Sequence, residues 1–131
     1  MIVDTSAIIA ILLKEEGFRI YAEAVDEADM VRLSVGNYVE VGTVIDRRPS
    51  PPLGDGFQEL IDEVAIIIEP MTEAQARIAR VAYRDYGKGS GHPARLNFGD
   101  CFAYALARDK MEPLLYKGDD FSHTDVRSAL P

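Results

Sequence analysis

Acidic side chains at five places in this sequence would form a metal site if the fold brought them together: Asp4, Glu40, Asp100, Asp119 and Asp120. Carboxylates that are pushed together repel one another, so such a cluster persists when a cation holds it. A ligand set made only of oxygen favours hard ions such as Mg²⁺ or Mn²⁺ over zinc. The acids therefore predict a Mg²⁺ or Mn²⁺ site, provided that the chain places them at one edge.

Short strand-like segments alternate with longer helical segments along the chain. Strands are expected at residues 1–4, 31–34, 64–68 and 113–116, and helices at about 7–13, 18–28, 35–48, 57–63, 72–86 and 98–110. This alternation predicts βαβ crossovers, and hence an α/β fold: a three-layer α/β/α sandwich with a mostly parallel central sheet. The loop at 49–56 is too short to be a domain linker, so residues 1–131 are expected to form a single domain.

That fold would bring the acids to one edge of the sheet. Asp4 follows the β-branched pair Ile2 and Val3 at the end of the first strand, where open α/β sheets place their ligand crevices. The last two acids follow the fourth strand, Asp100 lies in the first turn of a helix, and Glu40 lies a turn further along another helix. Helix N-termini at the same edge would favour anions, including phosphate.

Each acid also has a purely structural alternative. Asp4 or Ser6 can cap the helix that follows them. Asp100 is three residues after Asn97, the spacing of a capping box. Glu40 can be a solvated helix residue, and the last two acids can be ordinary turn residues.

Composition narrows the class of protein. The net charge of −8, from 14 basic and 22 acidic residues, argues against nonspecific nucleic-acid binding by the whole surface, but not against a nucleic-acid substrate. One cysteine and two histidines exclude a disulfide framework and a Cys-based zinc site. Cys101 is expected to be a small buried residue.

No membrane segment is expected, because the longest apolar run, at residues 7–13, is far shorter than the roughly 18 residues of a spanning helix. No basic region or small-residue cleavage site marks a signal peptide. We therefore expect a cytoplasmic protein.

Basic residues near the acids are candidates for phosphate contacts. Lys88 and Arg95 flank the start of the helix that carries Asp100, and Lys117 lies beside the last two acids. Three further cations share one face of the 72–86 helix and are expected to form a solvated stripe that pairs with nearby acids: Arg77, Arg80 and Arg84.

Several motifs resemble those of the PIN-domain ribonucleases, and most closely the VapC-type toxins of type II toxin–antitoxin systems. They are 'IVDTSA' at the start, Ser34 followed by five residues and Glu40, 'YGKGSGHPARLNFGDCFAYALA' around Asp100, and 'PLLYKGDDFSHTD' near the end. The resemblance covers essentially the full length. It implies a PIN-like fold and an endoribonuclease that uses Mg²⁺ or Mn²⁺ to hydrolyse single-stranded or looped RNA.

Carried over by motif, the resemblance makes Asp4, Glu40 and Asp100 metal ligands. It also implies that Thr5 or Ser6 would hydrogen-bond a site carboxylate or a phosphate. Whether one or two ions act stays open.

The fourth acid departs from the family pattern. The family usually has a threonine, any residue and then an acid three positions before a phenylalanine, whereas Tyr116 and Gly118 occupy those places here. Asp119 is the first candidate for the fourth ligand, and Asp120 is the second.

Partners follow only from the resemblance, which implies an RNA substrate, a cognate antitoxin protein and a homodimer. The apolar helices near residues 8–25 and 35–45 are candidate surfaces for the two proteins. Two other classes remain open: a catalytically weak PIN-like scaffold that binds a partner protein, and an aspartyl phosphotransferase that uses Asp4. Such phosphotransferases usually carry a second acid two residues after the first, where this chain has Ser6.

Overall fold

The computed structural model describes residues 1–49 and 51–131. Four short strands form one sheet in the order β3-β2-β1-β4, and every pairing is parallel. The strands are β1 (Ile2–Val3), β2 (Arg32–Ser34), β3 (Ile67–Glu69) and β4 (Leu114–Leu115). The predicted α/β fold with a parallel central sheet is confirmed.

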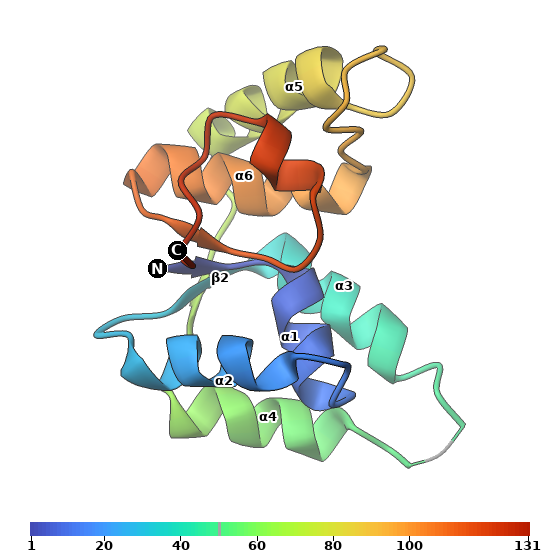
Figure 1. Ribbon diagram of the computed structural model, residues 1–131, viewed down its shortest axis with the longest axis vertical. Helices are drawn as coiled ribbons and strands as arrows, with labels where there is room; N and C mark the ends of the chain where they lie inside the picture. The colour runs from blue at the N-terminus through green and yellow to red at the C-terminus, as the bar shows by residue number, and fades with distance from the viewer. Residues whose placement is uncertain (50) are drawn as a thin grey trace.

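Helices cover both faces of this sheet. They are α1 (Thr5–Leu12), α2 (Phe18–Glu27), α3 (Val35–Ile45), α4 (Gly54–Glu63), α5 (Glu73–Tyr86), α6 (Phe98–Lys110) and a short 3₁₀ helix, η1 (Asp120–His123). Figure 1 shows α5 and α6 on one side of the strands and α1, α2 and α4 on the other, which gives the three expected layers. In the described parts of the chain, no helix is long and apolar enough to cross a membrane.

The central strand β1 is buried on both faces, as expected of a parallel sheet between helix layers. Because successive side chains of a strand point to opposite faces, Ile2 packs with α5 and α6 while Val3 packs with α1 to α4. Leu114 and Leu115 of β4 divide in the same way. Both apolar layers therefore hold β1 in place, and the position of Asp4, the next residue, is fixed with it.

The predicted third strand at 64–68 is wrong at its start, because Val64 and Ala65 form the turn that ends α4. The Ile66 N–H donates to the Ile61 carbonyl of α4 at 2.9 Å, and Ala65 has a left-handed backbone with φ 52°. Pairing with β2 begins only at Ile67 and extends to Glu69. The Glu69 side chain then forms an ion pair with Arg32 of β2.

The helices on either side of the predicted 49–56 loop begin or end at other residues than predicted. α3 ends at Ile45 rather than Arg48, and Arg48 precedes Pro49, a position that disfavours helical backbone. α4 begins at Gly54 rather than Phe57, with Asp55 in its first turn, where an acid complements the helix dipole. Ser50 of this loop lies outside the described residues.

Thr72 and Gln75, at the start of α5, have the spacing of a capping box but form only half of one. The Thr72 Oγ1 accepts a hydrogen bond from the Gln75 backbone N–H at 3.1 Å. The Gln75 side chain does not return to Thr72; it is buried and donates to Asp109 of α6 at 3.0 Å. This bond links α5 to α6.

We predict that Gly36→Ala destabilises the fold, because a Cβ at Gly36 would lie 2.7 Å from the Phe102 ring of α6. Overpacking of this kind costs about 1–3 kcal/mol. The matched control is Gly56→Ala in α4, where a Cβ meets nothing within 4 Å, so that alanine should be neutral or stabilising by up to ~1 kcal/mol. Chemical denaturation of both variants measures the difference, and equal free energies of unfolding would contradict the prediction.

Candidate metal centre

One cleft of about 340 Å³ opens beside the carboxyl end of β1, and three of the predicted acids line it: Asp4, Glu40 and Asp100. Asp4 follows β1, Glu40 lies on α3, and Asp100 lies in the first turn of α6. The other polar residues in the wall of the cleft are Thr5, Ser6, Glu15, Asn97 and Lys117. The fold thus brings acids that are up to 96 positions apart to one place.

Asp4 caps α1 and still has a free oxygen. Its Oδ2 accepts hydrogen bonds from the Ser6 N–H at 2.9 Å and from the Ser6 hydroxyl at 2.6 Å. The Ser6 hydroxyl in turn accepts from the Lys117 N–H at 2.9 Å, which ties the end of β4 to the same carboxylate. Asp4 Oδ1 is buried and has no hydrogen-bond partner among the described residues.

Burial raises the pKa of Asp4 to about 7. The hydrogen bonds from Ser6 lower that pKa, and the negative charges of Asp100 and Glu40 raise it again. A buried carboxylate between two further acids is costly to ionise without a cation.

Asp100 forms the capping box that its spacing from Asn97 predicts. The Asp100 N–H donates to the Asn97 side chain and Asp100 Oδ2 accepts from the Asn97 N–H, both at 2.8 Å. Burial raises the pKa of Asp100 to about 6, the nearby charges of Asp120 and Glu40 add to the increase, and Lys88 opposes it. Only Oδ2 serves the cap, so Oδ1 stays available for another ligand.

Glu40 lies against the first turn of α6, where the chain has Gly99. A Cβ at Gly99 would overlap the Glu40 carboxylate, so a larger residue there would displace that acid. The fully buried amide nitrogen of Asn37 has two N–H groups and lies within hydrogen-bond distance of three acceptors: Glu40 Oε1 at 3.3 Å, Thr5 Oγ1 at 3.1 Å and the Gly99 carbonyl at 3.0 Å. Thr5 thus contacts an amide rather than a site carboxylate.

Sequence reasoning missed Asn37. The available signal was its place three residues before Glu40, which puts both side chains on one face of a helix.

The last two acids are exposed and do not line the cleft. The Asp119 carbonyl accepts from Ser122 at the start of η1, and the Asp119 side chain makes no capping bond. Asp120 lies close enough to Asp100 to raise its pKa. Across residues 1–49 and 51–131, no three His, Cys, Asp or Glu side chains converge closely enough to form a ready-made ion site.

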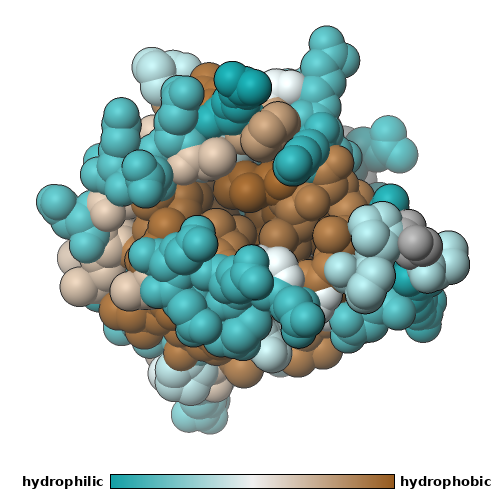
Figure 2. All heavy atoms as spheres, turned by 90° about the horizontal axis from the view of Figure 1, so that it is seen from below, coloured by the Kyte–Doolittle hydropathy of each residue, from teal (hydrophilic) through white to brown (hydrophobic). Residues whose placement is uncertain are grey.

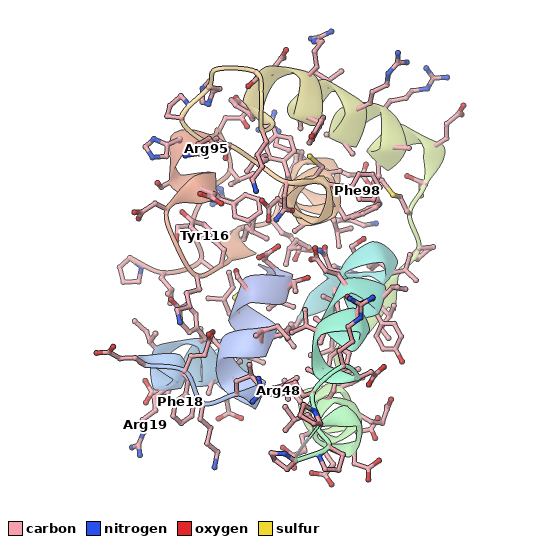
Figure 3. The ribbon with its side chains drawn as sticks, turned by 90° about the vertical axis from the view of Figure 1, so that its right-hand side faces the viewer. Phe18, Arg19, Arg48, Arg95, Phe98 and Tyr116 are labelled. Atoms are coloured by element: carbon pink, nitrogen blue, oxygen red, sulfur yellow. The ribbon has the colours of Figure 1, made fainter. Side chains whose placement is uncertain are left out.

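The predicted phosphate-binding residues lie at different distances from the acids. Lys117 lines the cleft, where its Nζ is 3.3 Å from Glu15. Lys88 lowers the pKa of Asp100, and its N–H donates to the Leu96 carbonyl just before α6. Arg95 is exposed; Figure 3 shows it and Phe98 on opposite sides of the start of α6.

Two other sequence interpretations can be placed. Arg77 pairs with Glu73 at 3.1 Å, and both side chains are exposed, as expected of a solvated stripe. Cys101 is buried, and burial raises the pKa of its thiol to about 12, so it is not a reactive thiolate.

The residues of the cleft fit a hard divalent cation. The donor atoms of its acids are all oxygen, the kind that Mg²⁺ and Mn²⁺ prefer. The unpaired Asp4 Oδ1 lacks the partner that buried polar atoms normally have. The raised pKa values of Asp4 and Asp100 reflect burial and mutual repulsion that a bound cation would relieve.

The sequence matches the PIN domain family over residues 1–127, and the chain belongs to this family. Among its curated relatives, ribonuclease VapC28 of Mycobacterium tuberculosis is 57% identical over 130 residues, which cover 99% of this chain and 98% of the relative. Ribonuclease VapC42 of the same species is 50% identical, with 98% of each chain covered. Ribonuclease VapC30 is 44% identical over the full length of both chains.

The fold also agrees with a solved structure. The crystal structure of Mycobacterium tuberculosis VapC20, described as a toxin that cleaves the sarcin–ricin loop, superposes with a TM-score of 0.74 over 95% of each chain. The two sequences are 19% identical, so this likeness concerns the fold alone.

We predict that Asp4→Asn changes how stability depends on pH. The pKa of Asp4 rises from 3.8 to about 7 on folding, so between these values the metal-free folded chain holds a proton that the unfolded chain releases. The free energy of unfolding should therefore decrease as the pH rises from about 4 to about 7, by at most ~4 kcal/mol from Asp4.

Denaturation in EDTA across this range tests the effect. Asp4→Asn keeps an acceptor for Ser6 but carries no charge, so it should be more stable than the wild type at pH 8. Its free energy of unfolding should also decrease much less than that of the wild type between about pH 4 and about pH 7. Parallel profiles for the wild type and the variant would contradict a raised pKa at Asp4.

Proposed function

We propose that this chain is a Mg²⁺- or Mn²⁺-dependent endoribonuclease that hydrolyses RNA phosphodiester bonds and acts as the toxin of a toxin–antitoxin pair. The observation that carries the proposal is the cleft in which Asp4, Glu40 and Asp100 meet, with one buried carboxylate oxygen left unpaired. The VapC relatives, matched over nearly their whole length, support the same reaction.

The proposed ligands are Asp4, Glu40 and Asp100, which hold the ion through carboxylate oxygens. A divalent ion in this position would lower the pKa of a bound water and stabilise negative charge on the phosphate. The protein needs no nucleophile of its own for such a hydrolysis.

The remaining residues of the cleft position these acids and the RNA. Ser6 fixes the Asp4 carboxylate through two hydrogen bonds, and Asn97 fixes Asp100 through the capping box. Lys88 and Lys117 are the cations we propose for the phosphates beside the cleavage site, with Arg95 further out. Lys117 forms an ion pair with Glu15, so its charge is partly neutralised before RNA binds.

For the fourth acid we propose Asp120 in place of Asp119. Neither acid lines the cleft, but Asp120 is the one whose charge raises the pKa of Asp100. Both acids are exposed at the start of η1, where a small backbone movement would bring a carboxylate toward an ion.

We propose an antitoxin and a second copy of the chain as protein partners. The segments suggested by the sequence do expose apolar side chains: Ile20 on α2, and Val35, Tyr38, Val39 and Val44 on α3. Figure 2 shows a hollowed apolar area between polar side chains on the face seen from below. Exposed apolar surface of this kind marks protein-binding sites. The proposed place of action is the cytoplasm, where the RNA substrate would be found.

A cleavage assay with purified protein tests the proposed function. We expect the wild type to cleave members of a panel of RNA stem-loops with Mn²⁺ or Mg²⁺, and to stop when EDTA is added. Asp4→Asn and Asp100→Asn should each reduce the rate at least about 100-fold, because each removes a charge that holds the ion. The matched control is Asp62→Asn on the exposed face of α4, which should retain the wild-type rate.

Three results would contradict the proposal. Cleavage that survives both EDTA and Asp4→Asn would exclude metal-dependent catalysis at this site. Metal binding without cleavage of any RNA would favour the catalytically weak scaffold. A phosphorylated Asp4 would instead revive the phosphotransferase.

Asp119 and Asp120 provide a matched pair for the fourth acid. We expect Asp120→Asn to raise the Mn²⁺ concentration needed for half-maximal cleavage by about tenfold, because it removes a charge near Asp100. Asp119→Asn should change it less than about twofold. A larger effect of Asp119→Asn than of Asp120→Asn would restore Asp119 as the fourth acid. If neither variant changes the Mn²⁺ requirement, the site has only three acidic ligands.

A further inference from the structure

The side chain of Asn37 is buried completely between α1, α3 and α6. Its amide nitrogen faces three oxygens on three different segments: Thr5 Oγ1 at 3.1 Å, Glu40 Oε1 at 3.3 Å and the Gly99 carbonyl at 3.0 Å. The Glu40 carboxylate and the Gly99 carbonyl can only accept hydrogen bonds, which favours the amide nitrogen rather than the amide oxygen on this side.

These three partners are related to the three acids in a simple way. Glu40 is itself one of the acids, Thr5 directly follows Asp4, and Gly99 directly precedes Asp100. One uncharged side chain is therefore bonded to every segment that supplies one of the three proposed metal ligands. Because the acids repel one another, a neutral donor placed among them can fix their spacing without adding charge.

The other end of the amide points to a role beyond packing. In the described parts of the chain, only two buried side-chain oxygens or nitrogens lack a hydrogen-bond partner, Asp4 Oδ1 and Asn37 Oδ1. Asp4 lines the cleft, and Asn37 is bonded to Thr5 and Glu40, which also line it. A buried polar group without a partner costs stability, and such groups in native proteins call for a functional explanation.

We propose that Asn37 is a positioning residue of the metal centre, which fixes Glu40 and the first turn of α6 relative to Asp4 and so supports the binding of a divalent ion. This inference rests on the proposed metal-dependent function. Gly99 complements Asn37, because the absence of a Cβ lets the Glu40 carboxylate lie against α6 while the amide holds it there.

Mn²⁺ binding by the whole chain in the absence of RNA tests this role. We expect Asn37→Ala to raise the Mn²⁺ dissociation constant, measured by isothermal titration calorimetry, by about ten- to a hundredfold, the usual effect of losing a residue that orients metal ligands. Asn37→Leu, which keeps most of the side-chain volume but donates no hydrogen bond, should give the same result and serves if the alanine variant does not fold.

The matched control is Gln75→Ala. Gln75 is also a buried amide that links two helices, but it bonds Asp109 on the far side of α6. Both substitutions should lower the free energy of unfolding in EDTA, and only the Asn37 variants should lose Mn²⁺ affinity. An equal loss of affinity in Gln75→Ala would reduce the role of Asn37 to general stability and overturn the inference.

A double-mutant cycle with Glu40→Gln separates positioning from ligation. If Asn37 acts through Glu40 and α6, adding Asn37→Ala to Glu40→Gln should weaken Mn²⁺ binding by less than it does in the wild type. Fully additive effects would overturn the inference.

Failure of the inference can be told from failure of the proposed function. Wild-type binding that is lost in Asp4→Asn but kept within about twofold in Asn37→Ala would overturn only the inference. A wild type that binds no Mn²⁺ would overturn both.

Discussion

The structure depends on keeping a carboxylate buried at the carboxyl end of its central strand. β1 is only two residues long, and both apolar layers pack against it, so the chain has no freedom to move Asp4 into solvent. The desolvation cost appears in the raised pKa of Asp4. It is offset in part by the Ser6 hydrogen bonds, and one carboxylate oxygen has no partner, so the rest of the cost is relieved by a proton at low pH or would be relieved by a cation. The buried carboxylate of Asp4 therefore lowers the stability of the metal-free fold, and the same feature favours the binding of an ion.

Helix capping and the proposed metal binding would use different oxygens of the same side chains, so they do not exclude each other. Asp4 caps α1 with Oδ2 and Asp100 completes the α6 capping box with Oδ2. Each cap fixes the side chain and leaves the second oxygen unused. The capping roles that the sequence suggested for Asp4 and Asp100 are present in the structure, and each helix start orients its acid toward the cleft.

Local patterns in the sequence predicted the elements whose signals lie within a few residues. The parallel sheet, the limits of α6 and its capping box follow from such patterns, and membership of the PIN-domain family is confirmed by the match over residues 1–127. The third strand was misplaced because an apolar run does not show where a helix ends and a strand begins. Asn37 was missed because an asparagine on a helix has no pattern of its own, and its three partners come from segments that only the fold brings together.

The negative charge of the cleft indicates that a cation has to bind there before an RNA phosphate can. Asp4, Glu40, Asp100 and Glu15 line it, and Lys117, already paired with Glu15, is the only basic side chain among its lining residues. The whole chain carries a further excess of acids, with a net charge of −8. A phosphate that approaches these carboxylates without a cation is repelled, and Lys88 at the rim offsets only part of that field. A divalent ion would then be needed to bind RNA at the cleft as well as to cleave it, so losing a ligand acid should weaken substrate binding together with the chemical step.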